Sequence, residues 1–95
     1  MKPLTFSPAV VFDLNGIWDY SAEQWGLDQA DLYIDELRDA CHALACGHKH
    51  GRPVDLRSGY LRILAGAHVI YYQDRDDRIS VIRILHSRMD VDRNL

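Results

Sequence analysis

Three side chains in the second half of the chain could act on a phosphate group: His86, Arg62 and Arg83. A histidine can donate or accept a proton near neutral pH. Two guanidinium groups can stabilise the negative charge that develops when a 2′-hydroxyl attacks the adjacent phosphate. Lone residues of catalytic type are a weak signal. In the structural alternative, which stays open, His86 caps a strand and the arginines pair with nearby acids.

A second cluster could bind a metal ion, because Cys46, His48 and His50 follow each other closely and Cys41 or His42 precedes them. Thiolate and imidazole are zinc ligands, but this spacing matches none of the usual zinc patterns. Cys41 also belongs to the apolar stripe of a predicted helix. A five-residue spacing on a helix points Cys41 and Cys46 in different directions, so no disulfide is expected. We expect no metal and no cofactor.

Five large aromatic residues are predicted to contribute mainly to the core, since aromatic side chains dominate the cores of small domains. They are Trp18, Trp25, Tyr33, Tyr71 and Tyr72. Tyr71 and Tyr72 are neighbours on a predicted strand, where successive side chains point to opposite faces. One of the two is therefore expected to be exposed, as an anchor for a partner.

No other catalytic arrangement can be recognised in the sequence. It contains no nucleophile–base pair, no paired catalytic carboxylates and no phosphate-binding glycine loop, since Gly51, Gly59 and Gly66 read as turn residues.

The first half of the chain predicts a short strand followed by two helices. Leu4–Phe6 alternates, and Ser7-Pro8 is a strong helix start, with serine as the cap and proline at the first helical position. Apolar residues then recur every third or fourth position as far as Gly26. The second helix, with Asp28 as its expected cap, ends at Gly47. The short connection predicts an antiparallel helical hairpin.

The second half predicts strands, because the period changes from 3.6 to 2 after a basic loop at residues 48–58. The three predicted strands are Tyr60–Leu64, Ala67–Gln73 and Ile79–His86. In the last of them, Ile79, Val81, Arg83 and Leu85 are expected to share one face. Sequential strands form an antiparallel meander, with the first strand at its edge and the helices covering one face. We therefore predict one α+β domain over residues 1–95.

Composition limits the function. The 95 residues are 47% hydrophobic and 26% charged, with a net charge of −3, so a folded domain with a modest core is expected. A core this small leaves a thin stability margin, so burial against a partner is also expected. Residues 1–45 carry a net charge of −6, whereas residues 46–95 carry +3, mainly from arginine. The overall acidity disfavours a constitutive nucleic-acid binder. No secretory signal or membrane span is recognised, so a cytoplasmic protein is expected.

Nearly the whole chain resembles the RelE/ParE superfamily of toxins from bacterial type II toxin–antitoxin modules, and it fits the ParE branch better than the RelE branch. The resemblance is carried by short segments in a specific order. They are Ser7-Pro8, Asp13-Leu14, Ile17-Trp18-Asp19-Tyr20, Gln24-Trp25-Gly26, Gly51-Arg52-Pro53, Leu56-Arg57, His68-Val69-Ile70-Tyr71-Tyr72, Ile82-Arg83-Ile84-Leu85-His86 and Met89-Asp90.

The resemblance implies a toxin that inhibits DNA gyrase by binding and is neutralised by a ParD-like antitoxin whose C-terminal segment wraps around it. It implies neither catalysis nor direct DNA binding by the toxin alone. The expected antitoxin contacts are Arg57, Arg62, Tyr71, Tyr72 and Arg83. The expected target contacts are Arg83, His86, Arg88 and Met89.

Two alternatives stay open. One is a ribosome-dependent mRNA endonuclease of the RelE type that uses His86, Arg62 and Arg83. The net charge and the lack of a dense lysine and arginine cluster disfavour it. The other is a non-toxic member that serves only as a binding module.

Overall fold

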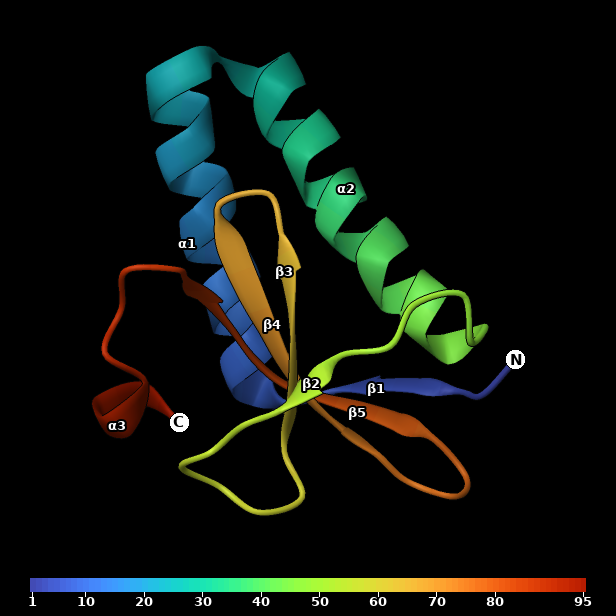
Figure 1. The fold of residues 1–95 in the computed structure, drawn as a ribbon. Helices are drawn as coiled ribbons and strands as arrows, with labels where there is room; N and C mark the ends of the chain where they lie inside the picture. The colour runs from blue at the N-terminus through green and yellow to red at the C-terminus, as the bar shows by residue number, and fades with distance from the viewer.

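The computed structural model describes residues 1–95 as two long helices packed on a sheet (Figure 1). This confirms the predicted α+β class. In chain order the elements are β1 (Leu4–Phe6), α1 (Pro8–Trp25), α2 (Leu27–Ala45), β2 (Arg52–Pro53), β3 (Leu61–Ala65), β4 (His68–Asp74), β5 (Ile79–His86) and α3 (Val91–Asn94). The two-residue strand β2 and the short helix α3 were not predicted.

The sheet has the order β1-β5-β4-β3-β2. Strands β3, β4 and β5 form the predicted antiparallel meander, and β2 pairs antiparallel with β3. Strand β1 pairs parallel with β5, with Leu4 opposite Ile79 and Phe6 opposite Val81. The N-terminal strand therefore joins the meander at its edge, as predicted.

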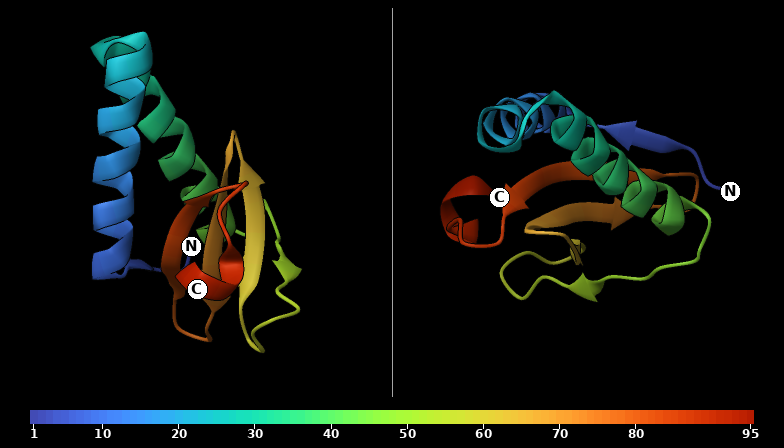
Figure 2. Two further views of the ribbon diagram at one scale, coloured as in Figure 1. Left: turned by 90° about the vertical axis from the view of Figure 1, so that its left-hand side faces the viewer. Right: turned by 90° about the horizontal axis from the view of Figure 1, so that it is seen from above.

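Helices α1 and α2 cover one face of the sheet (Figure 2). A cluster of eleven buried residues forms the main core between the helices and the sheet. Its members come from α1, α2, β4 and β5. Leu37 and Cys41 of α2 belong to this cluster together with Ile70 of β4 and Val81 of β5, and each is at most 1% exposed. No helix combines the length and the apolar character that a membrane crossing requires.

The start of α1 matches the sequence, whereas the start of α2 does not. The Ser7 hydroxyl accepts a hydrogen bond from the Val10 amide at 3.2 Å, and Pro8 occupies the first helical turn. Gly26, with a φ of 94°, is both the C-terminal cap of α1 and the N-terminal cap of α2. Asp28 lies inside the first turn of α2, so its predicted capping role was wrong. A single glycine at positive φ makes the connection shorter than the sequence suggested.

The end of α2 confirms the predicted stop. Gly47 has a φ of 78°, and its amide donates to the Leu44 carbonyl at 3.2 Å. The His48 amide donates to the Ala43 carbonyl at 2.9 Å. This pair of bonds is the Schellman arrangement, which satisfies carbonyls at a helix end and favours glycine at the left-handed position.

Strand β5 contains a bulge, and after it the side chains point to the opposite faces from those that simple alternation would give. Tyr71 pairs with Arg83 and Tyr72 pairs with Val81, so Ile82 has no partner across the sheet. Val81 and Ile84 consequently both point into the main core, while Leu85 joins a cluster on the far face. The expectation that Ile79, Val81, Arg83 and Leu85 share one face was therefore wrong, because an unpaired residue shifts the alternation by one.

The far face of the sheet carries a second cluster of four buried residues, Val54, Val69, Tyr71 and Leu85. Val91 and Leu95, in and after α3, pack against it. Tyr71 does point away from the helices, but the loop around Val54 and the C-terminal segment cover it, so it is only 2% exposed. Tyr72 is also 2% exposed, in the main core. The expectation of one exposed tyrosine was therefore wrong.

Candidate functional site

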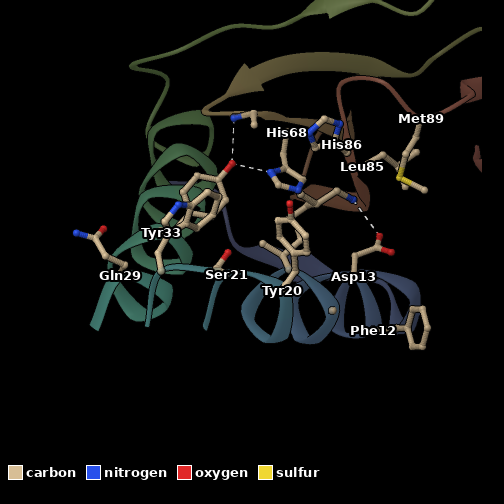
Figure 3. Close-up of a pocket in the computed structure, with 15 residues that line it drawn as sticks. Phe12, Asp13, Tyr20, Ser21, Gln29, Tyr33, His68, Leu85, His86 and Met89 are labelled. Atoms are coloured by element: carbon tan, nitrogen blue, oxygen red, sulfur yellow. Dashed lines mark hydrogen bonds between the residues drawn. The ribbon is translucent and has the colours of Figure 1, made fainter. Parts of the chain in front are cut away.

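A cavity of about 790 Å³ opens beside α1, between that helix, the start of α2, the start of β4 and the end of β5 (Figure 3). Its lining is mostly apolar. Asp13 is the only acid among the lining residues, which include no lysine or arginine. A largely apolar concave surface with a few polar groups is typical of a binding site.

Exposed apolar side chains stand around this cavity. Phe12 is 77% exposed, Trp25 65%, Tyr20 59% and Met89 43%. The rings of Tyr20 and Trp25 meet edge to face with centroids 6.0 Å apart. The prediction that Trp25 belongs to the core was therefore wrong. These residues form an exposed apolar patch, which in a small protein marks an interaction surface.

Tyr33 and His68 form the polar end of the cavity. The Tyr33 hydroxyl lies 2.6 Å from His68 Nδ1 and accepts a hydrogen bond from the Ala67 amide at 3.0 Å. A Cβ atom at Gly66 would come within 2.7 Å of the Tyr33 hydroxyl, and Gly66 has a φ of 59°. The turn between β3 and β4 therefore requires glycine to admit the tyrosine. Burial raises the pKa of the Tyr33 hydroxyl.

His86 lies directly opposite His68 across β4 and β5, and their rings are 5.3 Å apart at an angle of 84°. The His86 Nδ1 accepts a hydrogen bond from the Arg88 amide at 3.2 Å. Burial, and to a smaller extent the neighbouring His86, lower the pKa of His68. At neutral pH His68 is therefore uncharged.

An ion pair fixes one wall of the cavity. Arg83 donates to both carboxylate oxygens of Asp13, at 2.7 and 2.8 Å, and the Ile84 amide donates to the same carboxylate at 3.1 Å. The third nitrogen of Arg83 donates to the Asn94 carbonyl at 2.9 Å. Asp13 thereby raises the pKa of the guanidinium. Arg83 ties α1, β5 and α3 together.

The three candidate catalytic residues do not gather at one place. Arg62 and Arg83 flank Tyr71 in one row across the sheet, and Tyr71 lies on the far face. His86 borders the cavity on the helix side. The guanidinium of Arg83 is fully engaged by Asp13 and Asn94. Arg62 and His86 therefore belong to different surfaces, and Arg83 is held by its ion pair with Asp13 at the cavity wall.

Of the eight residues expected to bind a partner, Arg83 is held by Asp13 and Asn94. The other seven form three groups. His86 and Met89 line the cavity, and the exposed Arg88 follows directly on His86. Arg57 and Arg62 are exposed and remote from it, and Arg57 stacks on the Tyr60 ring at 5.8 Å. Tyr71 and Tyr72 are buried.

Sequence reasoning missed the lining contributed by α1 and the pairing of His68 with His86. A signal existed in α1, because Phe12, Gly16 and Tyr20 repeat every four residues on a face outside the apolar stripe.

The cysteines and histidines that could bind a metal, at positions 41–50, do not come together as a site. Cys41 is buried and Cys46 is exposed, and both are free. Burial raises the pKa of the Cys41 thiol to about 11, so this thiol is protonated and unreactive at neutral pH. No group of three His, Cys, Asp or Glu side chains is placed to hold a metal ion.

The sequence matches the family model described as the ParE toxin of the type II toxin–antitoxin system parDE, over residues 4–91. It is 44% identical over 91 residues to "Toxin ParE1" of Mycobacterium tuberculosis (strain CDC 1551 / Oshkosh), covering 94% of this chain and 93% of the relative. It is 38% identical over 91 residues to "Toxin ParE1" of Caulobacter vibrioides, covering 95% and 94%.

The fold is similar to a solved structure described as a chromosomal ParDE TA system from P. aeruginosa, with a TM-score of 0.80. That match covers 90% of this chain and 96% of the other at 18% identity, and it supports the fold alone. The family model and the two relatives span nearly the whole sequence. The chain therefore belongs to the ParE toxin family of type II toxin–antitoxin systems.

Proposed function

We propose that residues 1–95 act as one toxin domain in the cytoplasm, inhibiting DNA gyrase by binding it, and that a ParD-like antitoxin neutralises them. The exposed apolar patch around the cavity carries this proposal, because Phe12, Tyr20, Trp25 and Met89 surround it in a chain of only 95 residues. Side chains of this kind anchor protein partners. Membership of the ParE family and the ParDE structure with the same fold support an antitoxin of the ParD type.

In this proposal the antitoxin docks in the cavity. A segment docked there would bury the apolar patch and would lie against the helix side of β5. The stabilisation would be linked to binding, since a partner that binds only the folded toxin shifts its unfolding equilibrium. Arg57 and Arg62 lie away from the cavity and would be reached only by a segment that continues around the sheet edge at β2 and β3.

We further propose that gyrase contacts His86, Arg88 and Met89, at and just after the end of β5. His86 and Met89 also line the cavity, so an antitoxin seated there would cover part of the target-binding surface. Neutralisation would then follow from direct competition. The role of Arg83 is to position β5 against α1, since its guanidinium is bound to Asp13 and Asn94.

A supercoiling assay with purified gyrase tests the proposal. Added toxin is expected to block supercoiling, and the ParD-like protein encoded by the neighbouring reading frame is expected to restore it. Arg88→Ala should weaken inhibition, while Arg57→Ala, at another exposed arginine that is remote from the cavity, should not. Normal supercoiling at saturating toxin would refute the proposal. Cleavage of mRNA within codons on translating ribosomes would establish the endonuclease alternative instead.

A further inference from the structure

We propose that His68 and His86, here called the histidine pair, form a receptor for one carboxylate side chain on the antitoxin segment that docks in the cavity. This inference rests on the proposed antitoxin contact and adds the chemistry that selects the segment. It names an acidic residue, flanked by apolar ones, as the feature that the cavity recognises.

The tautomer of His68 is part of this proposal, because it decides whether Nδ1 donates to the Tyr33 hydroxyl or accepts from it. The Tyr33 hydroxyl accepts from the Ala67 amide, so its own proton is free to be donated to His68 Nδ1, 2.6 Å away. Because Nδ1 then accepts, the neutral ring carries its proton on Nε2. His68 Nε2 has no hydrogen-bond partner within the chain, so a donor at the cavity wall is left unpaired.

The same reasoning applies to His86. Its Nδ1 accepts from the Arg88 amide at 3.2 Å, which also places the proton of the neutral ring on Nε2. No hydrogen bond joins the two imidazoles, although their rings are only 5.3 Å apart. Figure 3 shows both rings at the same end of the cavity, with His68 between Tyr33 and His86. The histidine pair thus leaves two N–H donors at this end of the cavity, and the proposal is that one occupant takes both.

Charge favours a carboxylate as that occupant. From α1, His68 faces Asp13, whose charge is already matched by Arg83. From α2 it faces Tyr33, beside which Glu36 lies, and from β5 it faces His86. A carboxylate accepting from Nε2 would favour the protonated imidazole, so binding would take up a proton. Arg88, which forms no ion pair, adds a positive charge next to His86.

A protein segment fits this site better than the phosphate backbone of RNA. The cavity lining contains no lysine or arginine, and its mouth carries Phe12, Tyr20, Trp25 and Met89. Nucleic-acid binding relies on cations that neutralise several phosphates. An acidic residue between apolar neighbours matches both the donors and the apolar rim.

Isothermal titration of the toxin with the purified ParD-like antitoxin tests the proposal. A hydrogen bond to a charged group corresponds to roughly tenfold in affinity. We therefore expect about tenfold weaker binding for His68→Phe and for His86→Phe at pH 6. The wild type should bind severalfold more tightly at pH 6 than at pH 8, and His68→Gln should lose this gain. His48→Gln, at an exposed histidine that does not line the cavity, is the matched control and should behave as the wild type.

Two measurements on the free toxin keep the outcome decisive. Nitrogen NMR of the imidazoles is expected to find Nε2–H on both rings, and propionate is expected to shift the resonances of both. Unchanged affinity in both phenylalanine variants, a pH-independent wild type, or displacement of the antitoxin by an RNA oligonucleotide would overturn the proposal. A wild type that responds to propionate but binds no antitoxin would refute the proposed function and leave the carboxylate receptor supported.

Discussion

The two halves of the helical hairpin differ in how far their large apolar side chains are buried. At the base, residues 8–14 and 34–45 place large apolar residues such as Leu37 and Leu44 in the main core. At the tip, residues 16–33, the only buried residues are Ser21 and Ala30. Four large apolar residues of the tip, Tyr20, Trp25, Leu27 and Leu32, are exposed. Ile17, Trp18 and Tyr33 are half-buried.

The contrast follows from where the sheet ends. Figure 2 shows the hairpin extending past the sheet. Ile17 and Tyr33 still pack against the main core, whereas the far end of the hairpin has only the other helix to pack against. Small residues at positions 21 and 30 let the two helices approach closely without a sheet beneath them. The base therefore holds the fold, and the tip, together with the end of β5, is available for a partner.

Truncating one large residue in the base and one in the tip should give the largest difference in unfolding free energy between two variants. Leu37→Ala removes a side chain that is 1% exposed, and about 3 kcal/mol of unfolding free energy should be lost because a cavity remains. Trp25→Ala should change stability by no more than about 0.5 kcal/mol, while weakening antitoxin binding. Urea unfolding measures the first effect and titration with antitoxin the second. Equal losses of stability would show that the tip is part of the core.

Breaking the ion pair between the base of the hairpin and β5 should have the next largest effect on stability. Asp13→Asn removes the charge that Arg83 faces, and about 2 kcal/mol should be lost because the guanidinium stays three-quarters buried without a counter-ion. Asp28→Asn, at an exposed carboxylate in the first turn of α2, is the matched control and should be nearly neutral. Thermal unfolding of both variants measures the difference. A neutral Asp13→Asn would mean that apolar packing alone positions α1.

A substitution at the cavity wall should separate stability from binding. A Cβ atom added at Gly16 would meet nothing within 4 Å. Gly16→Ala should therefore raise the unfolding free energy by roughly 0.5–1 kcal/mol, since glycine is unfavourable inside a helix. Its antitoxin affinity should fall, because the methyl group enters the occupied cavity. If affinity is unchanged while stability rises, the docked segment does not contact α1 at this point.

The smallest effect concerns pH. Because the pKa of His68 is lower in the folded state, the unfolded chain binds more protons between the two pKa values. The stability that neutral His68 confers is complete above the unfolded pKa of about 6.5. It is lost as the pH falls through the folded pKa. His68→Gln should reduce the drop in melting temperature between pH 8 and pH 5. An identical drop in both proteins would place His68 in a solvated environment.

Much of the fold could be predicted because its signals are local. Ser7 and Pro8 specify a helix start by their own chemistry, Gly47 specifies a helix end, and the change of period near Tyr60 marks the first strand of the meander. The family resemblance lies in the same segments, and the match over residues 4–91 confirms it.

The cavity could not be predicted in the same way, because it depends on contacts between distant residues. Tyr33 and His68 are 35 positions apart, and they meet only because Gly66 turns β3 into β4 beside α2. The burial of Tyr71 likewise depends on Val54 and on the C-terminal segment, neither of which pairs with β4. Alternation along a strand predicts the direction of a side chain but not what covers it.

The bulge at Ile82 has a consequence for which deletions β5 can tolerate. Removing Ile82 would leave every later residue on its present face, since it is the one residue of the strand without a partner in β4. Removing Leu85 instead would turn His86 from the cavity towards the far face. Length variation in this strand is therefore neutral for the histidine pair at one position and destructive only a few residues later.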